Sequence, residues 1–180
     1  RIDASAQLRL LNPRIGTNAP QLAAVRAVVQ GVARYVPYVI YGPPGTGKTT
    51  TVIECILQAL KMPGATRYAN GTPRDGKFRV LACAPTNTAA DLLCAQLAHG
   101  CIAGRARMLR LNAYSRARSE VGSDVLPFCV LDGSTQNWET PSLAILQTYD
   151  VVVATLSTAG KLTNHGLASG HFDLLVIDEA

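Results

Sequence analysis

The 180-residue sequence lacks any uninterrupted apolar run of about 18 residues, which is the length that a membrane-spanning helix needs. It also begins without the charged-then-apolar order of a secretory signal peptide. We therefore expect a soluble, cytoplasmic protein with no membrane partner. Charged residues make up only 16% of the chain and hydrophobic residues 48%, so the sequence has enough apolar side chains to form a buried core.

Paired cysteines are also missing. The five cysteines are an odd number and include no CxxC pair, and they stand at Cys55, Cys83, Cys94, Cys101 and Cys129. Three of them lie inside otherwise apolar segments. We interpret them as reduced thiols of a cytosolic or nuclear protein rather than as zinc ligands or disulfides.

Acidic residues are scarce in the first two thirds of the chain. Up to Arg118 there are 16 Lys and Arg against 4 Asp and Glu, and from Ser119 onward there is 1 against 8. The two parts carry net charges of +12 and −7. The basic part indicates either a polyanionic partner or only a soluble basic domain.

Short apolar runs alternate with segments of helical periodicity. The apolar runs predict strands at residues 39–41, 78–84, 107–111, 150–154 and 174–177. Helical spacing predicts helices at residues 18–33, 49–60 and 87–99. Continuous rather than alternating apolar runs are typical of strands buried on both faces. The fold class predicted is therefore α/β, with a doubly wound, mostly parallel sheet and helices on both faces.

Two segments fall outside this alternation. Residues 61–77 are rich in glycine, proline and charge, and predict a long surface loop. Because this loop leaves a helix and enters a strand, we expect it at the N-terminal edge of the sheet, away from any nucleotide. Residues 112–148 show no clear period, and we expect helix and loops there.

A phosphate-binding loop follows the first predicted strand. Residues 42–49 read GPPGTGKT, match the pattern GxxxxGK[ST] in full, and open a predicted helix. Such a loop cradles phosphates with its backbone N–H groups at the positive end of the helix. We expect Lys48 to neutralise the β- and γ-phosphates of ATP and Thr49 to ligate Mg²⁺. The predicted ATP-binding residues of the loop are Gly42, Pro43, Pro44, Gly45, Thr46, Gly47, Lys48 and Thr49.

Two adjacent carboxylates complete the expected site. Asp178 and Glu179 directly follow the apolar run at 174–177, so they stand at the C-terminal edge of the sheet, where open α/β sheets bind ligands. We expect Asp178 to hold Mg²⁺. Glu179 is the expected base that orients and deprotonates the attacking water.

The motifs, taken in order, resemble those of the Upf-like branch of superfamily 1 helicases. Within that branch they are most similar to the Armitage and Moloney-leukaemia-virus-ten RNA helicases of small-RNA silencing. The resemblance covers nearly the whole chain and rests on NAPQ (18–21), GPPGTGKT (42–49), APTNTAADLL (84–93), VVVATLSTAGKL (151–162) and HFDLLVIDEA (171–180). It implies a RecA-like P-loop NTPase fold over residues 18–180, with residues 1–17 ending a preceding segment or linker.

The resemblance also implies roles for residues outside the phosphate loop. Gln21 would recognise the adenine edge, or else complete a capping box with Asn18. The residues implied to contact the nucleic-acid backbone are Pro85, Thr86, Asn87, Thr155, Leu156 and Ser157. For two of them a helix cap is the alternative: Asn87 as an N-cap, and Ser157 as the cap of a short helix.

The densest basic stretch lies between residues 105 and 118. Its arginines are Arg105, Arg107, Arg110, Arg116 and Arg118, with Tyr114 among them. One interpretation is stacking and phosphate contact with RNA. The other is a solvated charged face, which is the usual explanation of such a run. Because side chains of a strand alternate in direction, only some of these residues can share a surface.

We interpret the chain as the first motor domain of an ATP-dependent RNA helicase that moves on single-stranded RNA, 5′ to 3′ if the resemblance holds. The alternatives are a DNA helicase of the same branch and a non-hydrolysing, nucleotide-dependent scaffold. Both ends look cut, so we expect an incomplete domain whose second RecA-like partner is absent. In such ATPases a further strand separates the strand at 174–177 from the strand at 39–41, and we expect these two to face an unfilled slot. Silencing or decay proteins are the expected partners, in the cytoplasm or in ribonucleoprotein granules.

Overall fold

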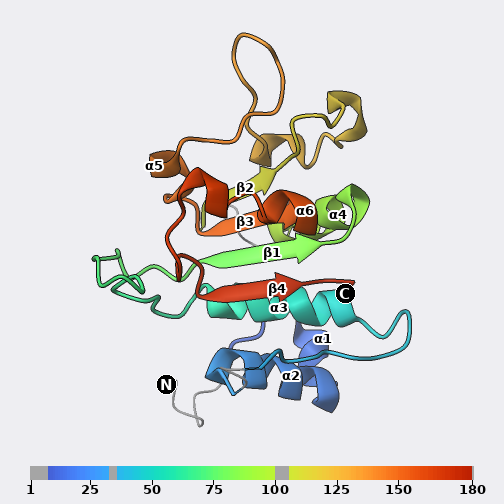
Figure 1. Ribbon diagram of the computed structural model, residues 1–180. Coiled ribbons are helices and arrows are strands. Elements are labelled where there is room, and N and C mark those ends of the chain that lie inside the picture. The colour runs from blue at the N-terminus through green and yellow to red at the C-terminus, as the bar shows by residue number, and fades with distance from the viewer. Residues whose placement is uncertain (1–7, 33–35, 100–105, 180) are drawn as a thin grey trace.

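The computed structural model describes residues 8–32, 36–99 and 106–179, and its centre is a parallel sheet (Figure 1). Its four strands are β1 (Val80–Ala84), β2 (Met108–Leu111), β3 (Val151–Thr155) and β4 (Leu174–Ile177). Their spatial order is β2-β3-β1-β4, and every neighbouring pair is parallel. The prediction of a parallel α/β sheet is confirmed, and four of the five predicted strands are present.

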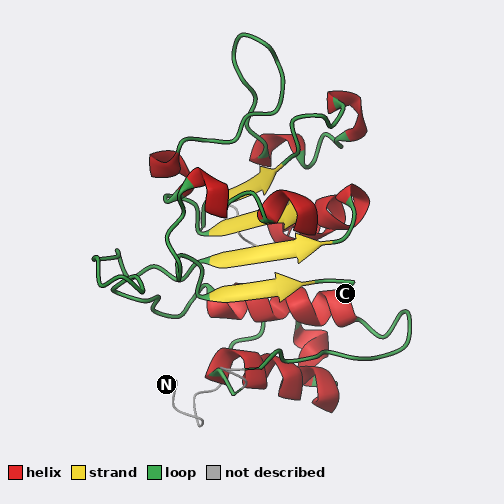
Figure 2. Ribbon diagram, in the orientation of Figure 1, coloured by secondary structure: helices red, strands yellow, loops and turns green. Residues whose placement is uncertain are grey.

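Helices cover both faces of this sheet (Figure 2). The longer helices are α2 (Ala19–Gln30), α3 (Lys48–Ala59) and α4 (Asn87–Leu97), which confirms the three predicted helices. The short ones are α1 (Pro13–Gly16), α5 (Leu143–Leu146), α6 (Leu156–Ala159), and the 3₁₀ turns η2 (Arg118–Glu120), η3 (Leu126–Phe128) and η4 (Thr163–His165). None of the helices in the part of the chain that the structure describes is long and apolar enough to span a membrane.

Alternate residues of the strands point into two different cores. On one face, Ala82 and Val153 pack with the apolar sides of α3 and α4. On the other face, Val152 and Leu109 pack with Leu146 of α5 and with Leu162, which follows α6. The continuous apolar runs of β1, β2 and β3 have this origin, because both of their faces are covered.

The strand predicted at residues 39–41 is wrong. These residues join no strand ladder in the described structure, and the side chains of Val39 and Tyr41 are 76% and 94% exposed. Only Ile40 packs against the core. An apolar run becomes a strand when a neighbour pairs with its backbone. β4 pairs with β1 alone among the described strands, so it makes no ladder with residues 39–41. The unfilled slot between the two segments stays a prediction.

Residues 61–77 form an ordered hairpin-like loop at the N-terminal edge of the sheet. Two antiparallel bridges, between Pro63 and Lys77 and between Arg67 and Pro73, join its arms. The Arg74 guanidinium pairs with both carboxylate oxygens of Asp173, just before β4, at 3.1 and 2.7 Å. The structure thus places the loop where we expected it. Arg67 bonds within the loop to Gly71, and neither Arg67 nor Arg74 contacts the phosphate loop.

Candidate functional site

The phosphate loop has the backbone that its glycines predict. Gly45 and Gly47 have φ of +75° and +83°, in the left-handed region that favours glycine. Gly47 is the N-cap of α3, which has no side-chain cap and no acidic residue in its first turn. Helix α3 therefore keeps its first N–H groups and the positive end of its dipole for an anion. These features fit a bound phosphate.

Lys48 lies against the inside of this loop. Its Nζ donates to the carbonyl oxygens of Gly42 at 2.9 Å and of Pro43 at 3.1 Å. The Thr46 hydroxyl donates to the same Pro43 oxygen at 2.8 Å. A phosphate is a stronger acceptor for an ammonium group than a neutral carbonyl. The charge of Lys48 is therefore held where the phosphates are expected, by contacts that a phosphate could replace.

Gln21 reaches the phosphate loop from α2. Its Nε2 donates to the carbonyls of Thr46 at 3.0 Å and of Gly47 at 3.3 Å. Asn18 caps α2 by accepting from the Gln21 N–H, but the Gln21 side chain does not return this bond, so only half of the capping box forms. With Nε2 held by two carbonyls, Oε1 is the acceptor that Gln21 presents. Contact with adenine stays a prediction for this residue.

Asp178 and Glu179 follow β4 at the C-terminal edge of the sheet. The Asp178 N–H donates to the carbonyl of Cys83 in β1 at 2.9 Å, so this peptide extends the sheet by one further bond. Glu179 then has φ of +58°, which few non-glycine residues adopt. The phosphate loop lies at the same end of the sheet, beyond the strand arrowheads (Figure 1). No hydrogen bond among the described residues joins either carboxylate to the loop.

The residues expected to contact nucleic acid also lie at this edge, after the two neighbouring strands. Ala84 at the end of β1 pairs with Thr155 at the end of β3, so the segments that follow them start side by side. Pro85, Thr86 and Ser157 are exposed, and Leu156 is 43% exposed. The structure therefore brings all six residues to one surface, next to the carboxylates that follow β4. Their contact with nucleic acid stays a prediction.

The residues that cap α4 and α6 are not the two that we named as possible caps from the sequence, Asn87 and Ser157. Thr86, not Asn87, is the N-cap of α4, and its hydroxyl accepts from Ala89 N–H at 3.2 Å. Thr155, not Ser157, is the N-cap of α6, and its hydroxyl accepts from Thr158 N–H at 3.3 Å. In both cases the last polar residue of the extended segment makes the cap, because an N-cap needs extended φ and ψ. Asn87 and Ser157 therefore do not cap these helices.

Two arginines of the basic stretch are internal rather than RNA-facing. Arg110 and Arg116 both pair with Asp91 of α4, and their side chains are almost fully buried. Burial alone would raise the pKa of Asp91, but hydrogen bonds and charge from Arg116 and Arg110 outweigh it and hold the pKa below its ordinary value. Neither a solvated face nor an RNA contact describes this pair. The sequence could have predicted the burial of Arg110. This residue stands two positions after Met108 in a strand, so the two side chains point to the same, inward face.

The other members of the basic stretch have varied surroundings. Arg107 donates to the Thr148 hydroxyl and lies 4.9 Å over the ring of Tyr149. Tyr114 is 71% exposed, and its hydroxyl accepts from Asn137 at 2.9 Å. Arg118 bonds the exposed Gln136. Arg105 lies outside the described residues.

The cysteines that the structure describes are free thiols, as expected. Burial raises the pKa of Cys55 and Cys94 to about 12 and that of Cys83 to about 11, so these thiols stay protonated. Cys101 lies outside the described residues. Within the described part of the chain no cluster of three His, Cys, Asp or Glu side chains is placed to hold a metal ion. The Mg²⁺ site expected from Thr49 and Asp178 would need the phosphates to complete it, as is usual for Mg²⁺.

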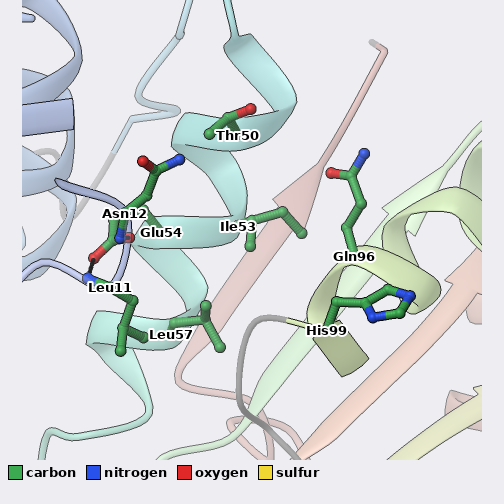
Figure 3. Close-up of a pocket in the computed structure, with 8 residues that line it drawn as sticks. All are labelled: Leu11, Asn12, Thr50, Ile53, Glu54, Leu57, Gln96 and His99. Carbon is green, nitrogen blue, oxygen red and sulfur yellow. Dashed lines mark hydrogen bonds between the residues drawn. The ribbon is translucent and has the colours of Figure 1, made fainter. Parts of the chain in front are cut away.

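A pocket of about 320 Å³ lies between α3, α4 and the segment before α1 (Figure 3). It is lined by Leu11, Asn12, Thr50, Ile53, Glu54, Leu57, Gln96 and His99, none of which is a predicted site residue. Glu54 is buried there and accepts from the N–H groups of Leu11 and Asn12, both at 2.9 Å. Its carboxylate thus satisfies two donors just before α1. Its role is to fix residues 11 and 12 against α3.

Known proteins resemble this chain over most of its length. A family profile for the AAA domain matches residues 16–140. The putative helicase MOV-10 of Gallus gallus is 39% identical over 173 residues, which are 96% of this chain and 16% of that protein. The RNA helicase Mov10l1 of Homo sapiens is 34% identical over 97% of this chain and 13% of that protein. The probable RNA helicase armi of Drosophila melanogaster is 27% identical over 91% of this chain and 14% of that protein.

Proposed function

Since this chain belongs to the AAA domain family of Upf-like superfamily 1 helicases, we propose that it binds and hydrolyses Mg-ATP as part of an RNA helicase. The relatives are far longer, and the chain spans about a sixth or less of their length. We therefore also propose the helicase activity of the full-length protein. One observation supports the proposed function. The phosphate loop, the carboxylates after β4 and the six residues expected to contact nucleic acid lie at the same edge of the sheet (Figure 1).

The proposed chemistry is divided among four side chains. Lys48 leaves its carbonyl contacts and neutralises the β- and γ-phosphates. Thr49 and Asp178 hold Mg²⁺, which when bound screens the negative charge of the phosphates. Glu179 orients the attacking water and accepts its proton. Gln21 presents its amide oxygen to the adenine ring of ATP, while its amide nitrogen stays bonded to the phosphate loop.

The proposed polymer is single-stranded RNA, on which the protein moves 5′ to 3′. Backbone contacts from Thr86, Thr155 and Ser157 would hold phosphates and sugars without reading sequence. The names of two relatives, RNA helicases of human and fly, support RNA over DNA. A DNA helicase of the same branch is the alternative that the experiment below separates.

The test uses the full-length protein and compares ATP hydrolysis with RNA and DNA oligomers of one sequence. We expect stimulation by RNA. Lys48→Ala should abolish nucleotide binding at micromolar Mg-ATP, whereas Glu179→Gln should retain binding and lose turnover. Thr50→Ala is the matched control, because Thr50 lies next to Thr49 but is exposed and faces the pocket. Equal loss of binding in both active-site variants would contradict the role of Glu179, and stimulation by DNA alone would contradict the RNA assignment.

We further propose that the protein acts in RNA silencing or RNA decay, in the cytoplasm or in ribonucleoprotein granules. The similarity to the Armitage and MOV-10 helicases supports this. The check is fluorescence microscopy of the tagged full-length protein together with sequencing of the RNAs cross-linked to it. A nuclear protein cross-linked to no RNA would contradict this assignment.

A further inference from the structure

Arg110 of β2 joins the acidic side chain of α4 to one candidate nucleic-acid residue. Its Nε donates to Asp91 Oδ1 at 2.8 Å, and its NH2 group donates to Asn87 Oδ1 at 3.1 Å. A third bond runs from NH1 to the carbonyl of Leu111 at 2.7 Å. The side chain is fully buried. Asn87 and Asp91 are four residues apart on α4, so they lie on one side of the helix, facing β2.

The chemistry of this contact decides which way the Asn87 amide points. A guanidinium group carries only donors, so the atom of Asn87 that faces it must be the oxygen. The amide nitrogen, with its two donors, is turned away from Arg110. No described residue accepts a hydrogen bond from Asn87 Nδ2, and the side chain is half-buried rather than enclosed.

The position of Asn87 gives these donors a use. It is the first residue of α4, directly after exposed Pro85 and Thr86, at the edge that the ends of β1 and β3 share. Phosphate oxygens and sugar hydroxyls accept hydrogen bonds, and amide donors at a helix N-terminus suit them. We propose that Arg110 is a positioning residue for nucleic-acid binding: it fixes the Asn87 amide so that its N–H groups face the polymer backbone.

Arg116 also binds Asp91, independently of Asn87. It pairs with both oxygens of Asp91, and its NH1 group donates to Asn112 Oδ1 at 2.8 Å. It makes no contact with Asn87. Two arginines thus bind Asp91, but only Arg110 also binds the side-chain amide of Asn87. This difference supplies a matched pair of variants.

The inference rests on the proposed binding of RNA, and the first experiment separates the two. In the full-length protein, Arg110→Lys and Arg116→Lys each keep a positive charge beside Asp91, but a lysine lacks the fork that bridges two partners. We expect Arg110→Lys to weaken binding of single-stranded RNA roughly threefold to tenfold, the effect of about one hydrogen bond. Arg116→Lys should bind RNA as the wild type does, and both variants should bind ATP normally.

The outcomes are distinct. If the wild type fails to bind RNA, the proposed function is wrong, and the inference falls with it. If the wild type binds RNA and both lysine variants bind it equally well, Arg110 has no positioning role and only the inference fails. Equal weakening in both variants would assign the effect to the buried ion pairs, which also overturns the inference.

A second pair of variants covers the case in which Arg110→Lys does not fold. Asn87→Ala removes the amide, whereas Asn87→Asp keeps an acceptor for Arg110 and replaces the donors with oxygen. If the donors face the backbone, Asn87→Asp should bind RNA more weakly than Asn87→Ala, although its thermal stability equals or exceeds that of the wild type. If Asn87 only satisfies Arg110, Asn87→Asp should bind RNA better than Asn87→Ala. That second order overturns the proposal.

Discussion

At the scale of single residues, His171 is the most unusual titratable side chain. It is 2% exposed, and neither ring nitrogen has a hydrogen-bond partner among the described residues. Burial lowers its pKa to about 4, and the charges of Arg79 and Arg74 add to this, while Asp173 and Asp75 oppose it. The ring stacks on Tyr68 at 6.2 Å. It therefore stays neutral and packs as an aromatic side chain against Tyr68 of the hairpin.

This histidine predicts a pH dependence of stability. An unfolded histidine binds a proton near pH 6.5, but folded His171 does so only near pH 4, so between these values the unfolded state binds more protons. Stability should therefore fall as pH falls through this window, by about 2 kcal/mol between pH 7.5 and 5. The measurement is urea unfolding at both pH values. His171→Phe, which keeps an aromatic ring, should lose less stability; parallel losses in the two proteins would contradict the prediction.

The sequence predicted residue types better than residue partners. The phosphate loop and the β4 carboxylates follow from fixed spacing along the chain, and the structure places both at the expected edge. The bond from Gln21 to the loop and the bond from Arg110 to Asn87 span 25 and 23 residues. Such contacts depend on which faces the helices present after packing. Local patterns therefore could not predict them.

At the scale of elements, the hairpin of residues 61–77 is fixed by one carboxylate. Asp173 accepts from the Ala65 and Arg79 N–H groups as well as from Arg74. The Arg74 side chain is fully buried in this contact. Gly64 packs so closely on Lys77 that an added Cβ would lie 2.0 Å from the Lys77 carbonyl oxygen. The loop was predicted from its glycines and prolines, but its order comes from these contacts.

Arg74→Met should destabilise the protein without changing its affinity for ATP. The substitution leaves Asp173 partly buried without its ion-pair partner. In buried pairs this lowers the free energy of unfolding by about 3 kcal/mol. ATP affinity should not change, because the hairpin is at the opposite edge of the sheet. Thermal unfolding and ATP titration measure the two effects.

Arg67→Met is the control for this experiment. Arg67 is exposed and bonds only within the hairpin, to Gly71 at 2.9 Å, so its loss should cost less than about 0.5 kcal/mol. Equal destabilisation by the two substitutions would show that the Asp173 pair does not fix the hairpin.

At the scale of the whole molecule, the described helices leave part of β4 uncovered. Leu175 and Ile177 of β4 are 59% and 43% exposed, on the face that α5 and α6 cover over β3. The edge of β4 away from β1 pairs with no described strand. An exposed edge with apolar side chains favours association between chains.

The 180-residue chain expressed alone should therefore self-associate. Leu175→Lys places a charge on the uncovered strand and should reduce the associated fraction, as charges do at natural edge strands. Leu92→Lys is the control, because Leu92 is 52% exposed but lies on α4. Sedimentation velocity over a range of concentrations measures the effect. An equal reduction by both substitutions would mean that net charge, not the β4 edge, sets the association.

The central position of β1 has a mechanical consequence. β1 is hydrogen-bonded to β4, which ends at the carboxylates, and to β3, which ends at Thr155. Neighbouring strands are about 4.8 Å apart, so the proposed hydrolytic and polymer-holding groups are separated by no more than roughly 10 Å of stiff backbone. In the proposed helicase, a displacement of β1 would therefore move the carboxylates and Thr155 together, with no relay of side chains between them.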